Sequence, residues 1–182
     1  MNPIAIFAAT RWELQAVRRG LATDRDATVD GVRCRIGQLG DRTYWLIQTG
    51  VGPIAADAVA RKVLQAQPMS LVISTGFACA LIPAQVGDLI IGTAVSSVHG
   101  ERTWTMKNDR VLCDGAVQAG LLIVAQGAGL VARVGTVVSS GTVVWQAEEK
   151  RRLRSLTDAI GLDMESAALA AVAMERGLPM AI

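Results

Sequence analysis

The sequence predicts a single-domain α/β protein with a mixed, mostly parallel twisted sheet and helices on both of its faces. Short apolar runs of buried-strand type alternate along the chain with longer segments whose apolar residues recur at helical spacing. The chain has 182 residues, which suits one hydrophobic core, and no internal repeat or low-complexity linker divides it. We therefore expect one domain over residues 1–182.

The first half of the chain predicts a strand, a helix, a hairpin and a crossover unit. Thr10 suits the N-cap of the first helix, and Pro53 suits the first turn of the second. Charged and apolar residues alternate over 32–39, which is typical of a half-exposed strand. The expected elements are a strand at 4–8, a helix after Thr10, strands at 32–39 and 44–49, a helix at 53–67 and a strand at 71–74.

The second half continues the alternation of strands and helices. The expected elements are a strand at 88–95, a helix at 116–126, a strand at 132–139, a helix at 148–160, a short strand at 162–164, a helix at 166–176 and the beginning of a strand at 178–182. Gly177 fits the end of the last helix. Strands that alternate with helices in this way favour parallel pairing.

The composition excludes several classes of protein. Hydrophobic residues make up 51% of the chain and charged residues 19%, so the chain can bury far more apolar surface than a disordered protein. The formal net charge is +2 and the arginines are scattered, which argues against a nucleic-acid partner. No apolar stretch is long enough for a membrane span, and no basic segment precedes the first apolar run, so we expect a cytoplasmic protein without a membrane partner.

The cysteine and histidine content argues against a disulfide framework and against a zinc site. The three cysteines, Cys34, Cys79 and Cys113, are widely spaced and form no CxxC motif, and His99 is the single histidine. We expect no bound metal, and we interpret the cysteines as small core residues in a reducing compartment.

Residues 50–55 fit the GxGxxA form of a dinucleotide-binding fingerprint and lie between an expected strand and an expected helix. Such a site also needs an acidic residue at the end of the following strand to bind the ribose. That strand ends in Ser74-Thr75-Gly76, without an acid. We therefore expect no dinucleotide cofactor, and no other cofactor is indicated.

Six segments, taken in order, resemble the methylthioadenosine/S-adenosylhomocysteine nucleosidases and their relatives in the nucleoside phosphorylase superfamily. They are AATRWEL at 8–14, TGVG at 49–52, STGFA at 74–78, VGDLI at 86–90, VSSG at 138–141 and GLDMESAA at 161–168. The segments DMESAA and VGDLII are the most specific, and the resemblance extends over almost the whole chain. It implies a nucleoside phosphorylase-like fold, a purine nucleoside as the small-molecule partner, and an N-ribosyl hydrolase activity.

The resemblance also implies separate roles for three residues. Cleavage of an N-glycosidic bond passes through an oxocarbenium-like sugar, so a site must hold the ribose, stabilise the leaving base and present a nucleophile. By resemblance, Glu165 binds the ribose hydroxyls, Met164 packs beneath the sugar, and Glu13 orients and deprotonates the attacking water. Without the resemblance, Glu13 is better explained as a first-turn glutamate that favours the helix dipole.

Five further residues are expected to bind substrate. Thr75, Gly76 and Phe77 occupy the turn after a central strand, where relatives place small residues and backbone amides beside the ligand. Phe77 stands where a serine or another small residue is common, so it either narrows the sugar side of the pocket or supplies an aromatic wall. Val144 and Trp145 fall near the residues that cover the base in relatives. Trp145 is placed either to stack on a purine or to pack in the core.

The choice of nucleophile depends on Ser74. Phosphorylases of the superfamily use an arginine two residues ahead of the glycine in this turn, and phosphorolysis needs such a cationic site. This chain has Ser74 at that position. We predict hydrolysis by water, and phosphorolysis with phosphate as co-substrate is the alternative.

The resemblance further implies that the family continues beyond residues 178–182. In relatives, an aspartate of a following Ser-Asp segment protonates the purine, and a C-terminal helix comes next. The 182 residues contain neither, so the domain is expected to be C-terminally incomplete, with the last strand and helix missing. A catalytically impaired nucleoside-binding protein is therefore a further hypothesis. A homodimer or larger homo-oligomer is expected, because relatives complete their pockets across a subunit interface.

Overall fold

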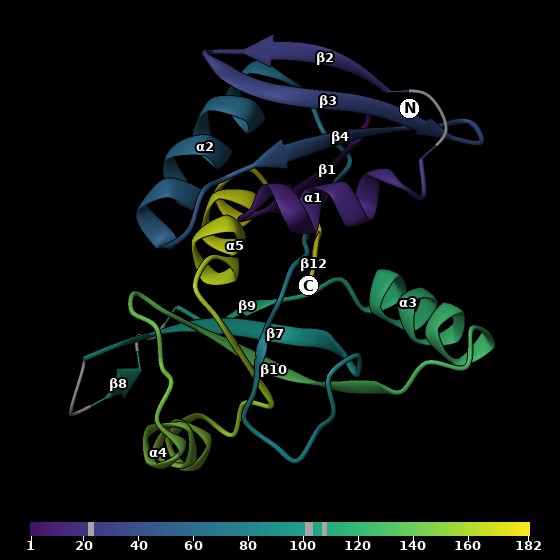
Figure 1. Ribbon diagram of the computed structural model, residues 1–182. Helices are drawn as coiled ribbons and strands as arrows, with labels where there is room; N and C mark the ends of the chain where they lie inside the picture. The colour runs from purple at the N-terminus through teal and green to yellow at the C-terminus, as the bar shows by residue number, and fades with distance from the viewer. Residues whose placement is uncertain (22–23, 101–103, 107–108) are drawn as a thin grey trace.

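The computed structural model describes residues 1–21, 24–100, 104–106 and 109–182, and in this part of the chain the strands form two mixed sheets (Figure 1). The first sheet has the order β12 (Met180–Ala181), β5 (Leu71–Ser74), β1 (Ile4–Ala8), β4 (Arg42–Gln48), β3 (Val32–Leu39), β2 (Asp24–Val29). Its first four strands are parallel, and β3 and β2 add an antiparallel hairpin at the edge.

The second sheet has the order β6 (Cys79–Ala80), β11 (Gly161–Asp163), β10 (Ala132–Ser140), β7 (Leu89–His99), β8 (Thr105–Met106), and β9 (Val111–Leu112) also pairs with β7. The strands β11, β10 and β7 are parallel, whereas β6, β8 and β9 pair antiparallel at the margins. The α/β class is confirmed, but the strands lie in two sheets where the sequence predicts one.

The helices are α1 (Arg11–Arg18), α2 (Pro53–Ala66), α3 (Gly115–Gly127), α4 (Ala147–Thr157) and α5 (Ser166–Glu175). The helix α5 lies between the two sheets in Figure 1 and contacts α2, β5, β7 and β10. Its residues Leu169, Ala170, Val172 and Ala173 are all buried, because a helix that is apolar on every side must be covered on every side. This helix explains the division of the strands, since one sheet packs on each side of it.

The local signals in the sequence explain most element boundaries. Thr10 caps α1, and Pro53 occupies the first position of α2, both as predicted. The strand β2 and the short strands β6, β8 and β9 were not predicted. The sequence of β2, DRDATV, has too few apolar residues to show a strand pattern, and it forms a strand because it extends the hairpin beside β3.

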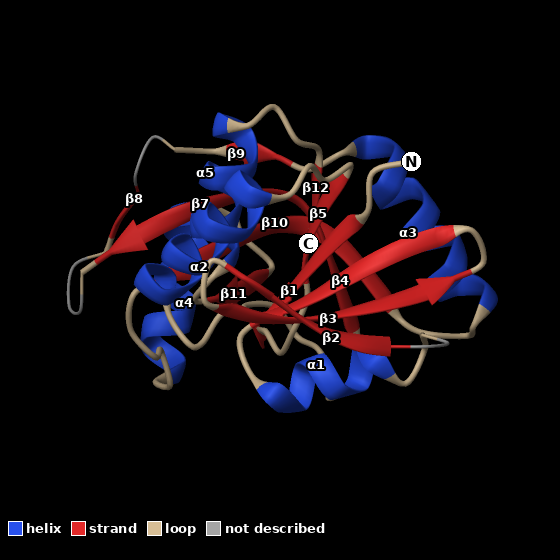
Figure 2. Ribbon diagram, turned by 90° about the horizontal axis from the view of Figure 1, so that it is seen from above, coloured by secondary structure: helices blue, strands red, loops and turns tan. Residues whose placement is uncertain are grey.

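The last residues of β1, β5 and β11, which are Ala8, Ser74 and Asp163, meet in one region because all three line the same cavity. Figure 2 shows these strands from above. A backbone hydrogen bond from Gly92 to the carbonyl of Ile182, at 2.9 Å, links the two sheets next to it. No helix in the described ranges is long and apolar enough to cross a membrane. The carboxyl ends of parallel strands are where α/β proteins bind ligands, so this region is the place to look for a site.

Candidate active site

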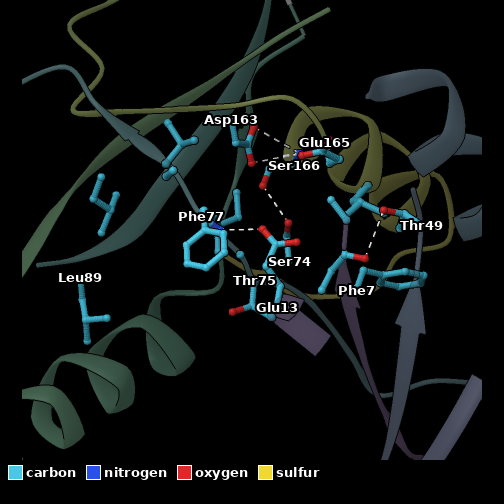
Figure 3. A pocket seen from close by; sticks show the side chains of 18 of the residues that line it. Phe7, Glu13, Thr49, Ser74, Thr75, Phe77, Leu89, Asp163, Glu165 and Ser166 are labelled. Carbon is cyan, nitrogen blue, oxygen red and sulfur yellow. Dashed lines mark hydrogen bonds between the residues drawn. The ribbon is translucent and has the colours of Figure 1, made fainter. Parts of the chain in front are cut away.

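Two adjoining cavities lie at the carboxyl ends of these strands, one of about 190 Å³ and the other of about 230 Å³. We call the smaller the first cavity and the larger the second cavity. The residues that line both are Ala9, Glu13, Phe77, Asp163 and Glu165. The last four are labelled in Figure 3. Three carboxylates, one from the first turn of α1 and two from the segment where β11 leads into α5, therefore meet where the cavities join.

Glu13 is buried and held at both carboxylate oxygens. Its Oε2 accepts hydrogen bonds from the backbone N–H of Thr10 at 2.7 Å and from the Thr10 hydroxyl at 2.8 Å. These contacts, with the bond from Glu13 N–H back to Thr10, form a capping box at the start of α1. Its Oε1 accepts from the backbone N–H of Phe77 at 2.8 Å. The side chain of Glu13 therefore both caps the start of α1 and lines the two cavities.

Gly76 is required for this position of Glu13. A Cβ atom on residue 76 would lie 2.5 Å from Oε1 of Glu13, which is too close for non-bonded atoms, and 3.0 Å from its Cδ, which is a tight contact. The carboxylate of Glu13 can therefore reach the backbone N–H of Phe77 because residue 76 has no side chain.

Glu165 connects the start of α5 to the start of α2. Its Oε1 accepts a hydrogen bond from the backbone N–H of Gly52 at 2.6 Å. Gly52 is the N-cap residue of α2, with a φ of 95° that favours glycine. The anion-binding position that a dinucleotide fingerprint offers to a phosphate is thus occupied by a carboxylate of the chain itself. A phosphate bound at residues 50–55 would therefore have to displace the carboxylate of Glu165 from the N–H of Gly52.

Asp163 is the third carboxylate at the junction of the two cavities, and no role was predicted for it from the sequence. It ends β11, accepts a short hydrogen bond from the Ser139 hydroxyl, and accepts the backbone N–H of Ser166 at 3.2 Å. Burial raises the pKa of Asp163, and the bonds from Ser139 and Ser166 oppose that rise. Its position in the DMESAA segment, directly before Met164 and Glu165, is the signal that could have identified it.

The pKa of Glu165 is raised as well. Burial is the main cause, and the nearby charges of Asp163 and Glu13 act in the same direction, whereas the hydrogen bond from Gly52 opposes them. Raised pKa values in a cleft are typical of functional carboxylates.

The first cavity brings together most of the predicted binding residues. Thr75, Gly76 and Phe77 line it together with Glu13 and Glu165. Ser74, where phosphorylases have an arginine, lies in the same wall, is buried, and shares a hydrogen bond of 2.8 Å with the hydroxyl of Ser166. Ser74 therefore joins β5 to the start of α5.

The second cavity contains two more of the predicted residues. Met164 and the buried Val144 line it, beside Glu165 and Phe77. Trp145 does not belong to this group: its side chain is 74% exposed, and it is not among the residues that line either cavity. His99 is exposed at the end of β7 and likewise lies outside both linings.

The charged residues among the described lining of the two cavities are all acidic. They are Glu13, Asp88, Asp163 and Glu165. Asp88 is paired with Arg133 at 3.0 Å, which leaves the other three without a cation among the lining residues. A site of this kind favours a neutral or cationic ligand and disfavours a dianion such as phosphate.

Comparisons with known proteins identify the family of the chain. A family model described as the phosphorylase superfamily matches residues 3–182. The 5′-methylthioadenosine/S-adenosylhomocysteine nucleosidases of two Staphylococcus aureus strains, RF122 / ET3-1 and MRSA252, are each 23% identical to this chain, over 98% of it and 83% of their own length.

Solved structures share the fold. The Neisseria meningitidis 5′-methylthioadenosine/S-adenosylhomocysteine nucleosidase in complex with methylthio-immucillin-A superposes with a TM-score of 0.90 at 21% identity, covering 100% of this chain and 84% of that one. The futalosine hydrolase of Helicobacter pylori gives a TM-score of 0.89 at 18% identity, covering 99% and 82%. With the family model matching nearly every residue, the chain belongs to the phosphorylase superfamily.

Proposed function

We propose that the protein is a nucleosidase that hydrolyses the N-glycosidic bond of a purine nucleoside of the methylthioadenosine/S-adenosylhomocysteine type. The observation that carries the proposal is the placement of Glu13 and Glu165 at the junction of two cavities. A nucleoside has a polar sugar and a flat base, and the bond between them suits such a junction. The similar nucleosidases from Staphylococcus aureus and Neisseria meningitidis support the same reaction.

The geometry supports different functions for the two carboxylates, with Glu13 activating water and Glu165 binding the sugar. Glu13 is fixed by three hydrogen bonds, and its carboxylate lines the cavity, where it can orient a water and take its proton. Glu165 is held by Gly52 and is partly exposed to both cavities, so it can accept hydrogen bonds from ribose hydroxyls. Met164 lies beside Glu165 in the second cavity, where it would pack beneath the sugar.

The acidic lining supports water over phosphate as the nucleophile. A phosphate would lie near the carboxylates of Glu13, Asp163 and Glu165, and Ser74 offers it a hydroxyl in place of a guanidinium. A developing oxocarbenium ion is positive, so the same carboxylates would stabilise it.

An assay on the purified protein tests the reaction. We expect methylthioadenosine to raise the melting temperature and to release its base in buffer free of phosphate, since a ligand bound by the native state alone stabilises it by mass action. S-adenosylhomocysteine and NAD should be compared, with free base measured by chromatography. Release that requires phosphate would show a phosphorylase. Binding without release would show a catalytically impaired binding protein, and stabilisation by NAD alone would contradict a nucleoside site.

We further propose that the protein forms a homo-oligomer through the rim of the second cavity. Val51, Phe77 and Val143 line that cavity and are 61%, 80% and 72% exposed. Apolar side chains gathered around a cavity mouth are typical of surfaces that another chain covers. Light scattering at micromolar concentration should give a multiple of 19.2 kDa. A monomer under these conditions would contradict the proposal.

A further inference from the structure

Asp163 and Glu165 are two residues apart and line the same two cavities, yet their hydrogen bonds differ completely. Glu165 is the N-cap residue of α5, but its side chain makes no capping hydrogen bond to the helix. It reaches instead to the N–H of Gly52 on another helix. Asp163 accepts the first N–H of α5, that of Ser166.

Because Asp163 caps α5, the carboxylate of Glu165 is not needed at the first turn of that helix and can point into the cavity. An N-cap carboxylate ordinarily accepts hydrogen bonds from the first turn of its own helix. Here Asp163 satisfies the N–H of Ser166 from outside the helix, and Ser139 accepts the N–H of Ala167 at 2.9 Å. The first turn of α5 therefore does not require the carboxylate of Glu165.

The donors around Asp163 require it to be an acceptor. The hydroxyl oxygen of Ser139 accepts the N–H of Ala167. Its single proton is donated to the carboxylate of Asp163. The N–H of Ser166 is likewise only a donor. The carboxylate thus joins the end of β10, the end of β11 and the start of α5, and it holds the turn that contains Met164 and Glu165.

Few titratable groups surround Glu165 among the described lining residues. Glu165 faces Asp163 on β11 and Glu13 on α1, and both raise its pKa. The remaining titratable groups among the described lining residues are Asp88, which is paired with Arg133, and the thiol of Cys79. Asp163 is therefore the charged neighbour of Glu165 that lies two residues away and is held in place by its own hydrogen bonds.

We propose that Asp163 is a positioning residue: it takes over the capping of α5 so that Glu165 stays directed into the cavity. Its negative charge also adds to the effect of burial in raising the pKa of Glu165, and so raises the pH below which Glu165 stops accepting hydrogen bonds from the sugar. This inference rests on the proposed role of Glu165 in nucleoside binding. It goes beyond that role because it assigns the orientation of Glu165, and part of the rise in its pKa, to a neighbour that need not touch substrate.

The test is Asp163→Asn, which removes the charge and leaves one acceptor oxygen for two donors. We expect KM for methylthioadenosine to rise about tenfold, on the scale of one lost charge-assisted hydrogen bond, while kcat changes less. We also expect the acidic limb of 1/KM to move to lower pH, because Glu165 loses a neighbouring negative charge. A purely structural role for Asp163 would raise KM without moving the limb.

A direct titration separates this inference from the proposed function. Carbon NMR of labelled carboxyl groups in the unliganded protein should show Glu165 titrating at lower pH in Asp163→Asn than in the wild type, whether or not the protein hydrolyses nucleosides. The exposed Asp158 at the end of α4 provides a matched control, since Asp158→Asn should leave the Glu165 titration unchanged. An unchanged Glu165 titration in Asp163→Asn would overturn the inference.

The wild type gives a second measurement should Asp163→Asn fail to fold. Two coupled carboxyls titrate in steps that belong to the pair, so the Glu165 signal should show a second inflection at the pH where Asp163 titrates. A single inflection in Glu165, unrelated to Asp163, would overturn the inference as well.

Discussion

Replacement of Glu13 by glutamine is expected to lower turnover by about 10²–10⁴-fold, while nucleoside binding stays near the wild-type value. The carboxylate of Glu13 is the group best placed to take a proton from water at the cavity, and an amide cannot take that proton. The contacts to the sugar belong to Glu165 and are left in place. Steady-state kinetics and a binding isotherm on methylthioadenosine measure both quantities.

The same substitution should leave the helix α1 intact. Glutamine is accepted at this position of a capping box, so the hydrogen bond from Thr10 N–H can be retained. Circular dichroism and the melting temperature check this point. Glu148→Gln is a matched control, because Glu148 is an exposed first-turn glutamate of α4 that pairs only with Arg152 among the contacts described. Equal losses of turnover in both variants would contradict the role of Glu13.

Replacement of Glu165 by glutamine is expected to weaken binding and turnover together, by about 10- to 100-fold in kcat/KM. A charge-assisted hydrogen bond contributes about 1.5–3 kcal/mol, and the sugar would lose such bonds in both the ground state and the transition state. A loss confined to kcat would contradict the assignment of Glu165 to sugar binding.

The substitution at Glu165 should also change how stability depends on pH. The raised pKa of Glu165 means that the folded protein binds a proton more readily than the unfolded chain does. Its contribution to stability is therefore present at low pH and is lost as the pH rises through the folded pKa. Glutamine does not ionise, so Glu165→Gln should gain in melting temperature relative to the wild type as the pH is raised from acidic to neutral. A constant difference across that range would contradict the raised pKa.

The sequence predicts the strands and helices that carry strong local signals. The apolar run at β1, the cap at Thr10 and the proline that begins α2 each fix an element through interactions within a few residues. The division into two sheets is a different kind of property. It follows from the burial of α5 on both sides, which depends on contacts between segments far apart in the chain.

The candidate site shows the same limit. Glu13 and Glu165 were found through the resemblance, and the structure brings them to one junction. The bond between Glu165 and Gly52 spans 113 positions, and nothing local to either segment indicates it. The hydrogen bond between Ser139 and Asp163 spans 24 positions, and nothing local to either segment indicates it either. The resemblance places Trp145 near the residues that cover the purine base in relatives. Its side chain is exposed in the structure, because the position of a residue in the sequence does not determine where its side chain points.

The close approach of Gly76 to Glu13 sets a limit on how the pocket can be redesigned. Any side chain at residue 76 would push the carboxylate of Glu13 away from the N–H of Phe77, so a library that varies this position should yield mostly inactive members. Residue 77 is the opposite case. The hydrogen bond to Glu13 comes from its backbone, and its side chain is 80% exposed, so the aromatic ring can be exchanged without disturbing that bond. An engineer who wishes to alter substrate preference should therefore leave the glycine fixed and vary its neighbour.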